Sequence, residues 1–196
     1  MYKNFACFIL FALLSGVSVA DDGEALAVVK EVCQLCHGME GEASNVVYPR
    51  LAGQNKNYIN KQLHDFKSGK RLGSMNDIAM NLSDAQMESL ATYFSQKPVL
   101  KHKVRNKEFS QVGWYIFHKG NKYSSVPACS SCHGKNGEGT DLLPRLAGQH
   151  KRYIEDQLNM FHERERTNDN AIMRSVAAKL TEMEIAAVAL YISGLE

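Results

Sequence analysis

Apolar positions follow the spacing of α-helices along most of the chain, and no segment alternates convincingly at the period of a β-strand. The helical ranges are 24–36, 55–67, 107–119 and 149–161. One more helix is predicted near the end of each half, where Ser83 with Gln86 and Thr181 with Glu184 form the capping-box pattern that begins helices. The pattern therefore predicts an all-α fold.

The first 20 residues form a different kind of segment. Lys3 carries the only charge before Asp21, and the range 5–19 is almost wholly apolar and ends in small residues. Such a segment is typical of a cleaved secretory signal. An uncleaved anchor helix is the alternative, but the run is shorter than the about 20 residues that a membrane span needs. We predict a signal peptide at residues 1–20, export to the periplasm, and no transmembrane helix after cleavage.

The sequence that follows the signal contains an internal repeat with two copies. The matching parts are CQLCHG at 33–38 with CSSCHG at 129–134, PRLAGQ at 49–54 with PRLAGQ at 144–149, and Met75 with Met173. Two copies predict a tandem pair of similar domains, each wrapped around its own core.

A basic segment with a proline and no helical apolar stripe separates the copies. It predicts an extended linker at 98–106, between an N-terminal domain at 21–97 and a C-terminal domain at 107–196. In the C-terminal copy, a loop at 120–128 separates the first helix from the cysteines.

Charge is small in total but unevenly divided. Residues 21–100 hold 8 basic and 10 acidic side chains, a net charge of −2, whereas residues 101–196 hold 14 basic and 11 acidic ones, a net charge of +3. So small a total predicts no nucleic-acid partner. The asymmetry would orient the molecule as it approaches a charged protein.

The cysteines of the mature chain lie in two Cys-x-x-Cys-His motifs, formed by Cys33, Cys36 and His37 and by Cys129, Cys132 and His133. Two thiols at this spacing reach the two vinyl groups of one haem, and the next histidine is carried to the iron. A thioredoxin-like dithiol belongs near strand–helix units, a zinc site would need closer pairs, and a disulfide between such near neighbours would be strained. The motifs therefore predict two covalently bound haem c groups.

The repeat also indicates the second axial ligand of each iron. Met75 and Met173 are equivalent, and a thioether opposite the histidine closes the coordination sphere and raises the reduction potential. Met80 has no methionine counterpart, yet it stays an alternative in the first domain, because the spacing from His37 to Met75 is 38 residues against 40 in the second copy. Histidines without a counterpart are interpreted as surface residues: His64, His102, His118, His150 and His162.

With these two haem motifs, two PRLAGQ segments and two methionines, the whole mature sequence resembles the dihaem cytochrome c4 family. The resemblance implies two class I cytochrome c folds with their haems near the domain interface. It implies a periplasmic carrier, often loosely membrane-associated, between a quinol-oxidising bc complex and a terminal haem–copper oxidase.

Two pairs of residues gain a role from the resemblance. The carbonyls of Pro49 and Pro144 are expected to accept the Nδ1–H of the axial histidines, which fixes each imidazole. Arg50 and Arg145 are expected to bond haem propionates, because a guanidinium matches the two oxygens of a carboxylate.

A one-electron carrier that catalyses no reaction is the function that these features favour. A dihaem peroxidase would need an iron with an open or displaceable position, and the paired methionines argue against that. A tightly held subunit of a larger dehydrogenase or oxidase would use the same domains, so the sequence leaves this alternative open.

Overall fold

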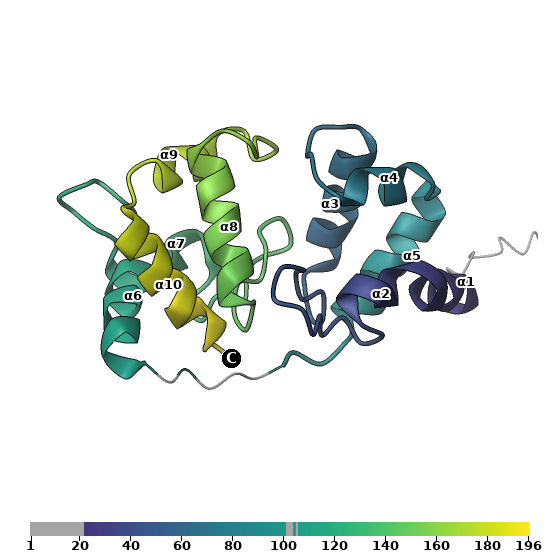
Figure 1. Cartoon of the computed structure of the whole chain (residues 1–196), viewed down its shortest axis with the longest axis horizontal. Coiled ribbons are helices and arrows are strands. Elements are labelled where there is room, and N and C mark those ends of the chain that lie inside the picture. Colours follow the sequence, from purple (N-terminus) through teal and green to yellow (C-terminus); the bar gives the residue numbers. More distant parts are fainter. Residues whose placement is uncertain (1–21, 101–103, 105) are drawn as a thin grey trace, which may run out of the picture.

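The computed structural model describes residues 22–100, 104 and 106–196. These residues form two helical domains that lie side by side, the N-terminal one on the right of Figure 1 and the C-terminal one on the left. Beyond an isolated bridge between Asn121 and Val126, no β-structure occurs in the described ranges. The predicted signal peptide and residues 101–103 and 105 of the predicted linker lie outside them.

The N-terminal domain consists of α1 (Asp22–Val28), the π-helix η1 (Val29–Cys33), α2 (Gln34–His37), α3 (Lys56–Lys67), α4 (Met75–Met80) and α5 (Asp84–Ser95). Helix α5 packs against α1 and α3, and α3 also packs against α4. The centre of this core is formed by Val29, Met87, Leu90 and Phe94, all with 2% or less of their surface exposed.

The C-terminal domain consists of α6 (Lys107–Lys119), α7 (Ser130–His133), α8 (Lys151–His162), α9 (Ile172–Ala177) and α10 (Glu182–Ser193). Helix α6 crosses α10 at Gly113, where an added Cβ would lie 2.1 Å from the carbonyl oxygen of Ala187. Only glycine permits this approach of the two backbones. Beside the crossing, Phe117 and Val188 are almost fully buried.

Most of the predicted helices agree with the structure, and both capping boxes are formed. The first helix differs, because η1 interrupts it with a π turn. Val29 is fully buried, but Val32, which a regular α-helix would place on nearly the same face, is 38% exposed. A π turn holds an extra residue and therefore rotates the positions that follow it. The sequence did not predict α4 and α9, which have only six residues each and no helical stripe of their own.

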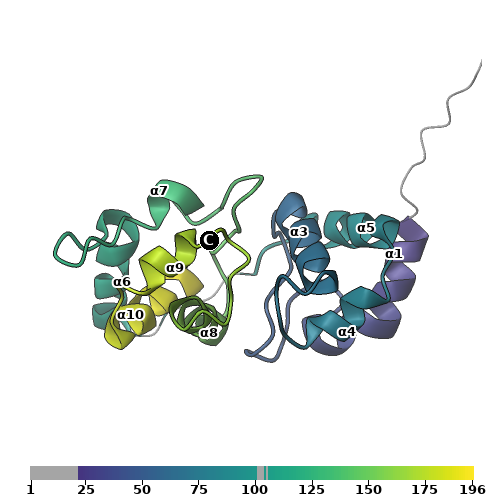
Figure 2. The same cartoon turned by 90° about the horizontal axis from the view of Figure 1, so that it is seen from above.

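The domains meet through repeat-equivalent residues. The Gln149 side-chain amide bonds the backbone N–H and C=O of Arg50 at 2.9 and 3.0 Å. The Gln54 amide makes the same two bonds to Arg145, at 2.7 and 2.9 Å. The repeat in the sequence thus becomes an approximate twofold symmetry at the interface, with α3 and α8 close to it in Figures 1 and 2.

No helix in the part of the chain that the structure describes is both long and apolar enough to cross a membrane.

Candidate functional site

Each Cys-x-x-Cys-His motif ends a short helix. His37 is the last residue of α2 and His133 the last of α7. Gly38 and Gly134 follow with φ of 76° and 86°, a conformation that favours glycine, and the chain turns away from the helix there. The helical turn holds the two cysteines and the histidine of each motif in a fixed relation.

Both histidines are buried, and their backbone partners fix their protonation. His37 Nδ1 lies 2.9 Å from the carbonyl oxygen of Pro49, and His133 Nδ1 lies 3.2 Å from that of Pro144. A carbonyl only accepts, so Nδ1 carries the proton and Nε2 keeps its lone pair. Burial lowers the pKa of both imidazoles more than these carbonyls raise it, which favours the neutral form that binds a metal.

The cysteines do not match a dithiol redox site. Burial raises the pKa of the Cys33 and Cys129 thiols to about 11, whereas a thioredoxin-like motif needs a low-pKa thiolate. Within the described residues, no three His, Cys, Asp or Glu side chains lie close enough together to hold a metal ion. Thiols that are bonded covalently to a haem need neither a low pKa nor further metal-binding side chains close by.

The methionines differ in their surroundings. Met75 is half-buried and packs on the same apolar cluster as Cys33. Met80, at the other end of α4, is 61% exposed. Met173 is half-buried on α9, and its backbone N–H donates to the Asp169 carboxylate. These positions favour Met75 over Met80 as the residue available to a buried iron.

The two arginines of the PRLAGQ segments are placed differently. Arg50 donates from Nη1 to the carbonyl oxygen of Gly148 at 2.6 Å and from Nε to that of Glu42 at 3.2 Å. Arg145 has a buried Nε without a partner. Because a buried donor without an acceptor is costly, Arg145 fits an anionic group such as a haem propionate.

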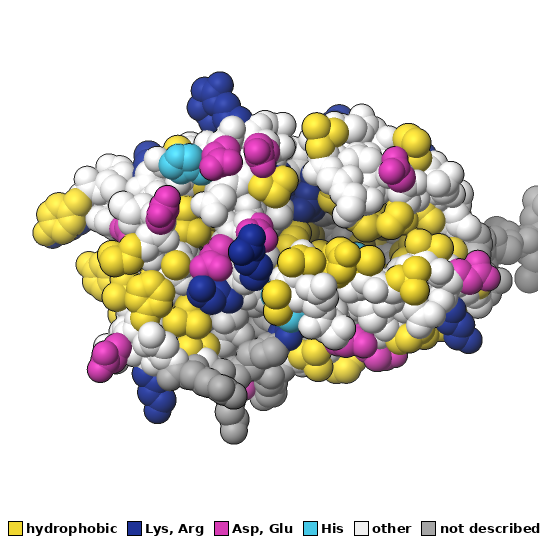
Figure 3. Space-filling model, viewed as in Figure 1, with side chains coloured by type: hydrophobic (Ala, Val, Ile, Leu, Met, Phe, Trp, Pro, Cys, Tyr) yellow, Lys and Arg dark blue, Asp and Glu magenta, His cyan; other side chains and the backbone are white. Residues whose placement is uncertain are grey.

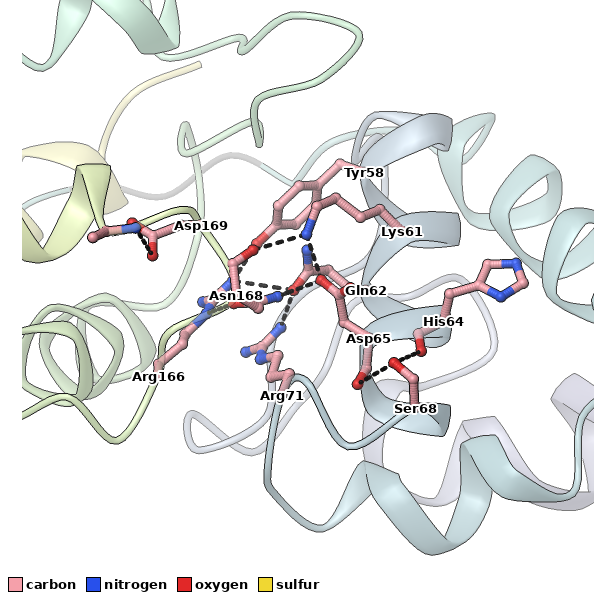
Figure 4. A network of polar contacts seen from close by, with 11 residues as sticks. Tyr58, Lys61, Gln62, His64, Asp65, Ser68, Arg71, Arg166, Asn168 and Asp169 are labelled. Atoms are coloured by element: carbon pink, nitrogen blue, oxygen red, sulfur yellow. Dashed lines mark hydrogen bonds and ion pairs between the residues drawn. The ribbon is translucent and has the colours of Figure 1, made fainter.

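A polar network links the domains beside these sites, and Figure 4 shows α3 side chains pointing at residues of the other domain. Arg166 donates to the Tyr58 hydroxyl at 2.9 Å and to Gln62 at 3.1 Å. Its repeat equivalent Arg71 donates to Tyr153 at 2.9 Å and to Gln157 at 2.7 Å. The network is therefore a second symmetric element of the interface.

Sequence reasoning missed this network. Arg71 and Arg166 lie 95 residues apart, the same offset as between Arg50 and Arg145. Extending the repeat alignment past the ends of α3 and α8 would have paired them.

The interpretation of all unmatched histidines as surface residues was wrong for one of those described. His150 is only 8% exposed, and its Nε2 lies 2.6 Å from the carbonyl oxygen of Ala43 in the other domain. His118 is half-buried and bonds Tyr191. His102 lies outside the described residues.

Comparisons with known proteins match both domains. The family described as cytochrome c matches residues 117–196, and the one described as cytochrome C oxidase, cbb3-type, subunit III matches residues 19–94. The chain is 38% identical to cytochrome c4 of Pseudomonas aeruginosa and 37% identical to that of Azotobacter vinelandii, in each case over 100% of both chains. The crystal structure of reduced recombinant cytochrome c4 from Pseudomonas stutzeri superposes with a TM-score of 0.83 at 37% identity, covering 90% of this chain and 99% of that one.

Proposed function

Because the chain belongs to the dihaem cytochrome c4 family, we propose that it is a periplasmic one-electron carrier whose irons are bound by His37 with Met75 and by His133 with Met173. The family consists of electron-transfer cytochromes, and the chain carries two covalently bound haem c groups.

We assign the covalent attachment of each haem to the two thiols of one motif. These are Cys33 and Cys36 in the first domain and Cys129 and Cys132 in the second. The haem supplies the one-electron couple at its iron. The protein residues anchor that group, orient the ligands and shield the site from water.

The observation that carries the proposal is the pair of buried, neutral imidazoles. Each has its Nδ1 proton engaged by a proline carbonyl, so each Nε2 is left as an oriented lone pair. This bond limits rotation of the ring and increases the electron density on Nε2. The half-buried Met75 and Met173 would close the opposite side, which leaves no position for peroxide or oxygen and argues against catalysis.

Arg145 is proposed to bond a propionate through its unpartnered guanidinium nitrogen. Arg50 is proposed for the same role in the first domain, where its guanidinium already contacts two carbonyls.

The donor is proposed to be a quinol-oxidising bc complex and the acceptor a terminal haem–copper oxidase. The unequal charge of the halves supports docking in a defined orientation, and loose association with the membrane surface is part of the same proposal.

A spectroelectrochemical titration of the purified protein, with its intact mass, tests the proposal. Two haems per chain are expected, both low-spin, both with a methionine–iron charge-transfer band and both at positive potential. A high-spin or low-potential haem would contradict the ligand assignment in that domain. Gel filtration of native periplasm tests the free carrier against a bound subunit, because a free carrier elutes near 21.9 kDa less the mass of its signal peptide.

A further inference from the structure

The C-terminal domain has a loop, residues 120–128, that the N-terminal domain lacks. In the N-terminal domain η1 ends at Cys33 and α2 at His37, so helix continues into the motif. In the C-terminal domain α6 ends at Lys119, and the loop leads to Cys129. Figure 1 shows it projecting from the side of the molecule opposite the N-terminal domain. Neither iron ligation nor the domain interface requires it.

The loop is held rigidly. Asn121 and Val126 exchange two backbone hydrogen bonds of 2.9 Å each, and Val126 is only 4% exposed. The Asn121 side chain donates to Glu184 at the start of α10 at 2.7 Å. Lys179 donates to the carbonyl oxygen of Ser125 at 3.1 Å. A surface ordered in advance loses little entropy when it binds a partner.

This rigid loop carries an exposed tyrosine beside a lysine. Tyr123 is 88% exposed, and the Lys122 ammonium lies 5.0 Å from the centre of its ring. Burial lowers the pKa of His118, and the nearby charges of Lys119 and Lys135 lower it further, so both lysines lie close to the base of the loop. We call the loop surface the exposed set Lys119, Lys122, Tyr123, Lys135 and Lys179.

One exposed carboxylate lies beside the loop surface, that of Glu138, which accepts the backbone N–H of Asn136 at 2.8 Å. Among the described residues, none of the four lysines of the loop surface forms an ion pair. Glu184, the carboxylate bonded to the loop, is 8% exposed and already accepts bonds from Thr181 and Asn121. Figure 3 shows further hydrophobic side chains gathered below the projection. An exposed tyrosine is a typical anchor of a protein-binding site, and Lys122 beside it with the other lysines of the loop surface supplies a charged rim.

The loop surface also lies next to a haem-attachment motif. The loop leads directly into Cys129, Cys132 is exposed, and Lys135 follows His133 by two residues. Because electron transfer slows steeply with distance, a partner bound here would be well placed for exchange with the second haem. The opposite charge of the N-terminal half would steer an acidic partner to this end.

We propose that the loop surface is the docking site for an acidic face of a redox-partner protein, which exchanges electrons with the C-terminal haem. The proposal rests on the proposed carrier function. A lipid surface fits less well, because membrane-surface elements present a long apolar helical face rather than one ring on a compact loop.

The test uses the ¹⁵N-labelled reduced holoprotein titrated at low salt with a synthetic polyglutamate peptide, followed by amide chemical shifts. Shifts are expected at residues 119–126 and around Lys135. Lys122→Glu/Lys135→Glu should weaken binding at least tenfold, and Tyr123→Ser about threefold without a change in charge. The matched control is Lys30→Glu/Lys70→Glu, which reverses two exposed lysines of the N-terminal domain and should change affinity less than about twofold.

Shifts spread evenly over both domains, or equal weakening by the control variant, would overturn the docking site. Binding to phosphatidylglycerol vesicles without binding to polyglutamate would overturn it in favour of a lipid surface. A redox titration of the same sample distinguishes a failure of the docking proposal from a failure of the proposed carrier function. Two low-spin haems at positive potential with no localised shifts would refute the docking site and leave the carrier function standing.

Discussion

Replacing Gln149 by alanine tests how much the symmetric interface contributes to stability. The Gln149 Oε1 accepts the backbone N–H of Arg50 and of His150, both at 2.9 Å, and its Nε2 donates to the Arg50 carbonyl at 3.0 Å. Gln149→Ala therefore leaves three buried backbone groups without their partners. Each such group costs about 1–3 kcal/mol, and water entering the vacated volume recovers part of that.

We expect a loss of about 2–4 kcal/mol in the free energy of the first unfolding transition, because the interface bonds break when either domain unfolds. Urea unfolding of the holoprotein, followed by far-ultraviolet circular dichroism and haem absorbance, measures it. Gln54→Ala removes the equivalent bonds to Arg145 and Asn55 and should have a similar effect. The double variant should lose less than the sum, because domains that have separated have no second pair left to break.

The control is Gln111→Ala on the exposed face of α6, which should change stability by no more than about 0.5 kcal/mol. If Gln149→Ala falls within the same range, the interface bonds contribute nothing, and the reasoning from unsatisfied buried groups is refuted for this interface.

Three further predictions concern single side chains. Met75→Ala should abolish the methionine–iron band of one haem and lower its potential, whereas Met80→Ala should leave the spectrum unchanged; the reverse pattern would move the ligand to Met80. Gly113→Ala should lower the thermal midpoint, with a loss of about 2 kcal/mol, because its Cβ would lie 2.1 Å from a backbone oxygen of α10; an unchanged midpoint would contradict the close crossing. Burial by itself raises the pKa of Glu184, but hydrogen bonds from Thr181 and Asn121 outweigh it and hold the pKa below its usual value. The resulting stability is present above about pH 5 and is lost as the pH falls through the folded-state pKa. The thermal midpoint of Glu184→Gln should therefore depend less on acid pH than that of the wild type. An equal dependence would exclude this carboxylate as the cause.

The haem chemistry could be inferred from the sequence because it depends on local spacing. The histidine follows two cysteines that are three residues apart, and one helical turn fixes their relation wherever the helix packs. The tandem organisation was equally visible, because the repeated PRLAGQ segment needs no structure to be recognised. The capping boxes at Ser83 and Thr181 also depend only on neighbouring residues. Helices α5 and α10 begin directly after these two residues, as predicted.

The loop surface depends both on the local sequence and on tertiary contacts. The sequence located the extra loop between α6 and Cys129, but its rigidity comes from bonds to Glu184 and Lys179, more than 50 residues away along the chain. A loop of the same composition without those bonds would present Tyr123 in many positions rather than one.

What the sequence determined by itself is the all-α class, the duplication and the two haem motifs, because covalent spacing and helical periodicity act over a few residues. The tertiary structure decided which methionine is sheltered, that His150 is buried, and that Arg71 and Arg166 cross to the opposite domain. The sheltering of Met75 depends on packing within the N-terminal domain. The other two outcomes depend on contacts between residues 86 to 108 positions apart, and the free energy of such contacts exists only once both domains have folded and their repeated surfaces meet.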